Sequence, residues 1–206
     1  MILELLFSLL LLFPSIILHE YAHGWVANKL GDPTAKLAGR LSLNPLKHID
    51  PVGTIILPGI LLSMRFFGIN TFVFGWAKPV PVNFSRLKSP RRDMVLVALA
   101  GPITNILIAV LLSIFLHSIS IEIIQMACAV GIYVNVFLAL FNMMPIPPLD
   151  GSRLIMGILP NPLLRIYASL EPYGIAIVAL ILYLGIDDQI LIPIVRYCVN
   201  LLGVNL

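Results

Sequence analysis

Long apolar runs separated by short polar stretches dominate the chain and predict helices that enter a membrane. Residues 94–116 and 123–144 contain no charged side chain, and each is long enough to cross a hydrocarbon core of about 30 Å. An earlier helix is expected over about residues 3–30; it lacks the positive start and cleavage site of a removable signal peptide. Two shorter apolar runs, 172–186 and 190–206, predict further helices.

Three other stretches depart from this helical pattern. Residues 51–68 are largely apolar but have Gly53, Pro58 and Gly59 in their interior, which favours a re-entrant or bent hairpin over a full span. Residues 34–43 alternate as a β-hairpin would, and residues 75–83 contain two prolines that leave only an edge strand or a polyproline-like segment. The predicted fold is an all-α membrane protein, a bundle of about five to six membrane segments with a short re-entrant hairpin and small β-like elements on the cytoplasmic side.

Composition and charge support a polytopic membrane protein. Of the 206 residues, 59% are hydrophobic and 11% charged, which excludes an ordinary soluble monomer. The net charge of +3 does not point to nucleic acid, because the basic residues lie in loops that flank apolar segments. Residues 31–50 and 69–92 are rich in Lys and Arg and are expected on the cytoplasmic side, whereas residues 117–122 are expected outside. The two cysteines lie in apolar runs and predict no disulfide. A single domain over residues 1–206 is expected, with its core in about 1–155 and C-terminal helices in about 160–206.

One motif in the first helix carries chemistry. His19 and His23 are four residues apart, so they share a helix face and both imidazoles can bind one zinc ion. Glu20 lies beside them, where a carboxylate can take a proton from water activated by the metal. Ionisable side chains are costly inside a membrane helix and usually mark a functional site. This pattern is the machinery of peptide hydrolysis.

A catalytic zinc site normally needs a third protein ligand. His117 is expected on the external side, away from the first two ligands. Asp150 follows the helix end at residues 142–149 at the same depth as the two histidines, and Gly151 allows a tight turn after it, so Asp150 is preferred over His48. For His48 and Asp50 we expect surface or turn roles. Asn105 is expected to face the site from a closely packed helix, where it could contact substrate.

Three motifs together identify a family. HEYAH at 19–23, AGPITN at 100–105 and NMMPIPPLDG at 142–151 resemble the site-2 protease family of intramembrane zinc metalloproteases, in its compact prokaryotic branch without PDZ or CBS domains. The resemblance implies that His19, His23 and Asp150 bind zinc and that Glu20 is the general base. It also implies that Asn142 assists substrate binding or the developing oxyanion.

The sequence therefore predicts a protease that cleaves a transmembrane protein substrate with one Zn²⁺ per chain, in a prokaryotic plasma membrane, with the active site toward the cytoplasm. The cut is expected inside the substrate's membrane segment or at its cytoplasmic edge, after local unwinding, with residues 34–43 or 75–83 accepting the unwound strand. The alternatives are a membrane zinc or proton transporter and a catalytically inactive relative that holds substrate. A transporter is disfavoured because the sequence shows no repeat symmetry; the intact Glu20 disfavours an inactive relative.

Overall fold

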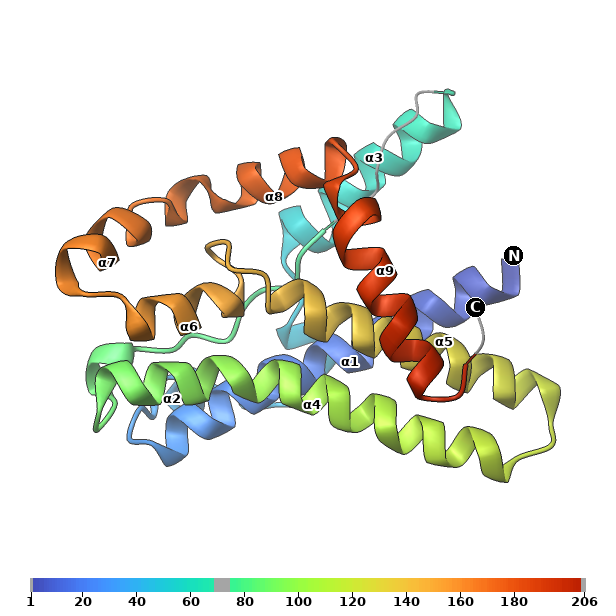
Figure 1. Ribbon diagram of the computed structural model, residues 1–206, viewed down its shortest axis with the longest axis horizontal. Helices are drawn as coiled ribbons and strands as arrows, with labels where there is room; N and C mark the ends of the chain where they lie inside the picture. The colour runs from blue at the N-terminus through green and yellow to red at the C-terminus, as the bar shows by residue number, and fades with distance from the viewer. Residues whose placement is uncertain (1, 69–74, 205–206) are drawn as a thin grey trace.

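Three long helices form the centre of the molecule, which is described here from a computed structural model of residues 2–68 and 75–204. They are α1 (Ile2–Lys29), α4 (Pro90–Ser118) and α5 (Glu122–Asn142), and they pack side by side (Figure 1). The other helical elements are α2 (Thr34–Leu37), η1 (Pro45–Lys47), η2 (Pro51–Ile56), α3 (Leu57–Phe66), η3 (Phe84–Arg86), α6 (Asp150–Ile158), α7 (Asn161–Ala168), η4 (Glu171–Tyr173), α8 (Gly174–Tyr183) and α9 (Ile186–Leu201). All regular structure in the described residues is helical, which confirms the all-α class but shows no strand at the expected β-like elements.

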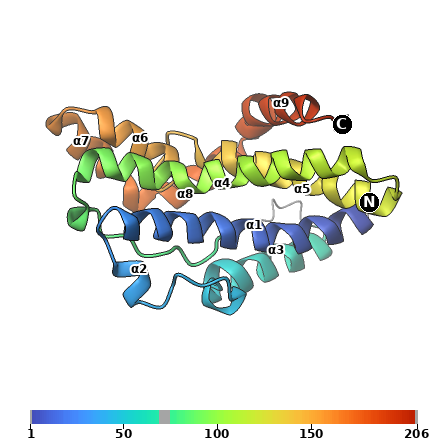
Figure 2. The same ribbon diagram turned by 90° about the horizontal axis from the view of Figure 1, so that it is seen from below.

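Among the fully described residues, three helical stretches are long and apolar enough to cross a membrane. They are α4, α5 and the run 161–183, which combines α7, η4 and α8. Figure 2 shows α1 on one side of the α4–α5 pair and α9 on the other. The main apolar core lies where α9 packs on this pair and includes Ala109, Ile132, Val136, Val195 and Val199. The total of five to six membrane segments remains a prediction.

Residues 51–66 do not form the expected hairpin. They make one continuous helical run, π-helical in η2 and α-helical in α3, which begins at Pro51 and extends away from the three long helices in Figure 1. The Asp50 side chain caps its start by accepting hydrogen bonds from the backbone N–H groups of Val52 and Gly53. The wider π-helical turn precedes Pro58, whose ring would clash with a regular preceding turn. Six of the residues assigned to the cytoplasmic stretch 69–92, residues 69–74, lie outside the described part of the chain.

The β-hairpin expected at residues 34–43 is wrong, because residues 34–37 form the short helix α2 with Ala35 fully buried. Contacts with distant parts of the sequence favour the helical turn over a hairpin. The buried carboxylate of Asp32 accepts hydrogen bonds from the backbone N–H and hydroxyl of Thr34 and from the backbone N–H of Asn83. Burial alone would raise the pKa of the Asp32 carboxyl, but these hydrogen bonds hold that pKa below its ordinary value.

The stretch 75–83 is extended, as its prolines predict, and has one edge attached to the protein. The backbone N–H of Trp76 donates to Gly53 O at 3.1 Å, and that of Lys78 donates to His48 O at 2.9 Å. The Lys78 carbonyl in turn accepts from the buried guanidinium of Arg40 at 2.7 Å. These hydrogen bonds attach the segment to Arg40, His48 and Gly53, in the stretch of chain that follows α1.

Candidate metal centre

His19 and His23 bring their imidazole rings together on the inner face of α1. The two side chains are one helical turn apart, and their Nε2 atoms lie 3.0 Å from each other. Only 5% of His19 and 8% of His23 is exposed. The i, i+4 spacing thus directs both ring nitrogens to one buried point, as the motif predicts.

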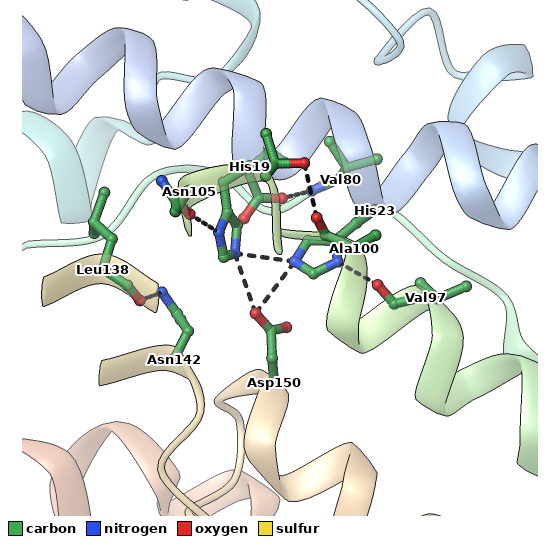
Figure 3. A network of polar contacts seen from close by, with 11 residues as sticks. His19, His23, Val80, Val97, Ala100, Asn105, Leu138, Asn142 and Asp150 are labelled. Atoms are coloured by element: carbon green, nitrogen blue, oxygen red, sulfur yellow. Dashed lines mark hydrogen bonds and ion pairs between the residues drawn. The ribbon is translucent and has the colours of Figure 1, made fainter. Parts of the chain in front are cut away.

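Asp150 reaches the same point from a different part of the chain. It is the first residue of α6, after the Pro-rich loop that follows α5. Its Oδ2 lies 3.1 Å from His19 Nε2 and 3.3 Å from His23 Nε2 (Figure 3). A Cβ on the next residue, Gly151, would lie 2.1 Å from Met143 O. Gly151 is therefore required for the close approach of α6 to the end of α5, and not for the tight turn that the sequence suggested.

Hydrogen bonds on the far side of each ring fix which nitrogen faces the centre. His23 Nδ1 donates to the backbone carbonyl of Val97 at 2.7 Å, and His19 Nδ1 donates to Asn105 Oδ1 at 2.5 Å (Figure 3). Each neutral ring carries its proton on Nδ1, because a carbonyl oxygen can only accept. Both Nε2 atoms therefore present a lone pair to Asp150, which is the arrangement that metal-binding histidines adopt.

This set of atoms fits a zinc ion. The three ligand atoms are 3.0, 3.1 and 3.3 Å apart, close to the spacing of about 3.3 Å that a tetrahedron with zinc–ligand bonds of about 2.05 Å requires. With both imidazoles neutral and protonated on Nδ1, no hydrogen lies between their Nε2 atoms and the carboxylate, and a bound cation would offset the repulsion among these three atoms. Gly101 of α4 leaves the space open: a Cβ there would lie 2.5 Å from the Nε2 atom of both His19 and His23.

A cavity of about 730 Å³ opens beside the centre, and Glu20 lies on its wall with His19, His23 and Asp150. One carboxylate oxygen of Glu20, Oε2, accepts a hydrogen bond from the backbone N–H of Val80 at 2.7 Å. The extended segment thus holds the candidate base and lines the same cavity. Apolar side chains form most of the remaining wall, which includes Ile16, Trp76, Phe137, Phe141 and Val178.

Two asparagines predicted from the motifs have different surroundings. Asn142, the last residue of α5, lines the cavity and donates from Nδ2 to Leu138 O at 2.9 Å (Figure 3). Asn105 is fully buried behind His19 and is not part of the cavity wall. Asn105 therefore contacts His19, one of the three candidate metal ligands, and does not border the cavity that a substrate would occupy.

The other candidates lie away from the centre. His48 is fully buried and donates from Nε2 to Ser42 O at 2.8 Å; it is not on the surface but lies in the turn that ends η1, which is the expected turn role. Asp50 caps η2, which is the expected turn role. His117 lines a separate cavity with Glu122 and Gly203, near the loop between α4 and α5. In the described residues, only His19, His23 and Asp150 form a group that could hold a metal ion.

Sequence analysis missed several residues around the site. Asn135 and Ser15 are buried polar residues within apolar helices, and their polarity in that setting was an available signal. Arg153 lines the cavity and makes a two-pronged ion pair with Glu171, with its Nη2 2.5 Å from Oε1. This pair connects α6 to η4, which leads directly into α8, and α8 forms part of the cavity wall. The sequence could not single out the Val97 carbonyl, because every residue has a backbone carbonyl.

Comparison with known proteins agrees with this geometry. The chain is 36% identical over 195 residues to the protein named "Putative zinc metalloprotease YwhC" from Bacillus subtilis, covering 90% of this chain and 84% of that protein. It belongs to the site-2 protease family of zinc metalloproteases. Another relative of this site-2 protease is "Putative zinc metalloprotease Rip2" from Mycolicibacterium smegmatis, 28% identical over 82% of this chain and 63% of the relative. "Putative zinc metalloprotease MJ0611" from Methanocaldococcus jannaschii is 40% identical over 29% of this chain. No family model and no solved structure matches the chain.

Proposed function

We propose that this site-2 protease hydrolyses a peptide bond in or near the transmembrane segment of a membrane-protein substrate, with one zinc per chain held by His19, His23 and Asp150. The observation that carries the proposal is the meeting of these three side chains at the wall of a mostly apolar cavity between helices. Such a cavity suits a substrate whose side chains are themselves apolar. The helices are expected to be surrounded by lipid.

Zinc, when bound, supplies a Lewis acid for the scissile carbonyl and lowers the pKa of water to about 7. Glu20 accepts the proton of the attacking water and passes it to the leaving nitrogen of the cleaved bond. Its Oε2 is engaged by Val80 N–H, which leaves Oε1 for this transfer. Asn142 faces the cavity with an amide group, which can donate to the substrate carbonyl oxygen as negative charge develops there.

The extended segment offers a site for an unwound substrate strand. Successive residues of an extended chain direct their backbone groups to opposite sides. Trp76, Lys78 and Val80 direct theirs toward the protein. Ala77 and Pro79 alternate with them, line the cavity, and make no backbone hydrogen bond within the described residues. A substrate strand that pairs with Ala77 and Pro79 would pass the metal centre.

The centre is placed near one end of α1. His23 precedes Lys29, the last residue of that helix, by six residues (29 − 23), or about 9 Å at 1.5 Å per residue. The basic loops that follow α1 and precede α4 are at this end, so we place it on the cytoplasmic side of a prokaryotic plasma membrane. The zinc would then lie below the membrane surface but within the bilayer.

The test uses the purified protein in lipid vesicles with a single-span membrane protein as substrate. Cleavage is expected, and it should stop with a chelator and return with added zinc. Metal analysis should find one zinc per chain, lost in His19→Ala, His23→Ala and Asp150→Ala. Cleavage that persists without zinc would contradict the proposal, as would zinc movement across the vesicle membrane without cleavage, which indicates a transporter. Stable substrate binding without any cleavage by the zinc-loaded protein would instead indicate an inactive relative.

A further inference from the structure

A chain of buried polar side chains leads away from His19 and crosses three helices. Asn105 of α4 accepts from His19 Nδ1 and donates from its Nδ2 to Asn135 Oδ1 of α5 at 2.8 Å. Asn135 in turn donates from Nδ2 to Ser15 Oγ of α1 at 2.9 Å. The three polar residues are at most 4% exposed. None of them lines the cavity beside the metal centre, so the chain lies behind the site.

Backbone carbonyls at the far end fix the direction of every hydrogen bond in this chain. Asn135 Nδ2 also donates to Gly131 O at 2.9 Å, and the Ser15 hydroxyl donates to Leu11 O at 2.8 Å. The Gly131 carbonyl can only accept, and the Ser15 hydroxyl already donates its one hydrogen to Leu11 O, so it too can only accept from Asn135. Both Gly131 O and Ser15 Oγ therefore require the amide nitrogen of Asn135 on their side.

The oxygen of Asn135 must therefore face Asn105. The Asn135 oxygen can only accept, so it pairs with the Asn105 nitrogen. The Asn105 oxygen then faces His19 and accepts from it, so the proton of the His19 ring is on Nδ1. His23 obtains the same tautomer in a simpler way, by donating directly to the Val97 carbonyl. Both ligands are thus set by backbone carbonyls, His23 directly and His19 through two amides.

We propose that Asn135 and Ser15 are positioning residues that hold His19, through Asn105, in the tautomer and orientation that bind zinc. The proposal rests on the zinc site proposed above and extends it to residues outside the three motifs. Without the Asn135 oxygen, the Asn105 amide is free to rotate and present its nitrogen to His19. The ring would then carry its proton on Nε2, where it blocks the metal.

A purely structural role is the competing explanation, because the same bonds connect α1, α4 and α5. Interhelical hydrogen bonds of this kind stabilise membrane helix bundles. The two explanations differ in what they predict for metal affinity in a protein that stays folded. Positioning lowers zinc affinity, whereas a structural role lowers only the unfolding temperature.

The experiment measures zinc affinity of the full chain in detergent by competition with a chromophoric chelator, well below the unfolding temperature of every variant. Asn105→Ala is expected to weaken binding by about 10–100-fold, and Asn135→Ala by about 10-fold, as for other partners of metal ligands. Ser15→Ala is expected to have a smaller effect, because Asn135 keeps its bond to Gly131 O. The visible spectrum of bound Co²⁺ should change in Asn135→Ala, because it reports the ligand geometry directly.

Two comparisons separate positioning from stability. If Asn135 acts through Asn105, adding Asn135→Ala to Asn105→Ala should change affinity by no more than about 2-fold, which is the usual error of additivity. Asn135→Asp keeps an oxygen toward Asn105 and, when protonated, one donor toward Gly131 O, so it should bind zinc more tightly than Asn135→Ala. Ser113→Ala is the control, since it removes a similar bond, from Ser113 Oγ to Leu202 O, near the other end of α4.

The possible results are distinct. Parent-like zinc affinity and Co²⁺ spectrum in Asn135→Ala, with or without a lower unfolding temperature, would overturn the inference and leave the proposed function intact. An additive loss in the double variant would also overturn it. Failure of the proposed function itself would appear differently, as His19→Ala retaining the parent's zinc.

Discussion

Replacing Gly101 with alanine tests the metal centre through a single added methyl group. The new Cβ would lie 2.5 Å from the Nε2 atoms of both His19 and His23. Ordinary contact distances for such atoms are about 3.5 Å, so the rings would have to move by about 1 Å. Their Nδ1 atoms are held by Asn105 and the Val97 carbonyl, so neither ring can retreat without losing a buried hydrogen bond.

Zinc sites tolerate ligand displacements of about 0.2 Å, well below this 1 Å. Gly101→Ala should therefore bind zinc at least about 100-fold more weakly than the parent, beyond the effect of losing an outer hydrogen bond alone. Chelator competition and metal analysis measure the loss. Gly59→Ala is the matched control, because a Cβ there meets nothing within 4 Å. A Gly101→Ala protein with parent stoichiometry and affinity would refute the placement of the metal between the two rings.

Three further predictions follow from other parts of the molecule. Glu20→Gln should keep zinc and fold but lower kcat by about 10²–10⁴-fold, measured with the vesicle assay, because the amide cannot accept a proton; near-parent turnover would remove Glu20 as base. In a background without the native cysteines, Lys36→Cys and Ser85→Cys should resist an impermeant external thiol reagent that labels Ser120→Cys; labelling only one of the first two would mean that residues 51–68 cross fully. Asp32→Ala should lower the unfolding temperature by about 5 °C at pH 7. Because folding lowers the pKa of Asp32, the contribution of its carboxylate to stability is complete well above pH 3.8 and is lost as the pH falls below that value. The difference in unfolding temperature between Asp32→Ala and the parent should therefore become smaller in acid. A difference that does not depend on pH would contradict this.

The long helices could be predicted because their signal is local. The uncharged runs that became α4 and α5 were identified within a few residues of their observed ends, since only a helix satisfies the backbone in lipid. The meeting of His19 and His23 also follows from helix geometry alone. Asp150 required a further step, an argument about equal depth, and the structure brings it to the same point.

The failures occurred where distant contacts outweigh local pattern. Residues 34–43 alternate as a hairpin would, yet the carboxylate of Asp32, which also binds Asn83 far along the chain, favours a helical turn there. Asn135 was passed over because its neighbours form a membrane helix, and its partners Asn105 and Ser15 come from two other helices. Such pairings depend on how the helices pack, which no single segment encodes.

The position of the cut in a membrane-protein substrate tests the central claim most directly. The measurement is mass spectrometry of both product termini after cleavage of a single-span substrate in vesicles, with Glu20→Gln as the inactive control. The account predicts a cut inside the substrate's membrane segment or at its cytoplasmic edge, made faster by Gly or Pro near the scissile bond and slower by Leu or Ala in place of existing helix breakers. A cut only in a soluble loop, indifferent to these substitutions, would show that the protein is a membrane-anchored protease that acts outside the bilayer.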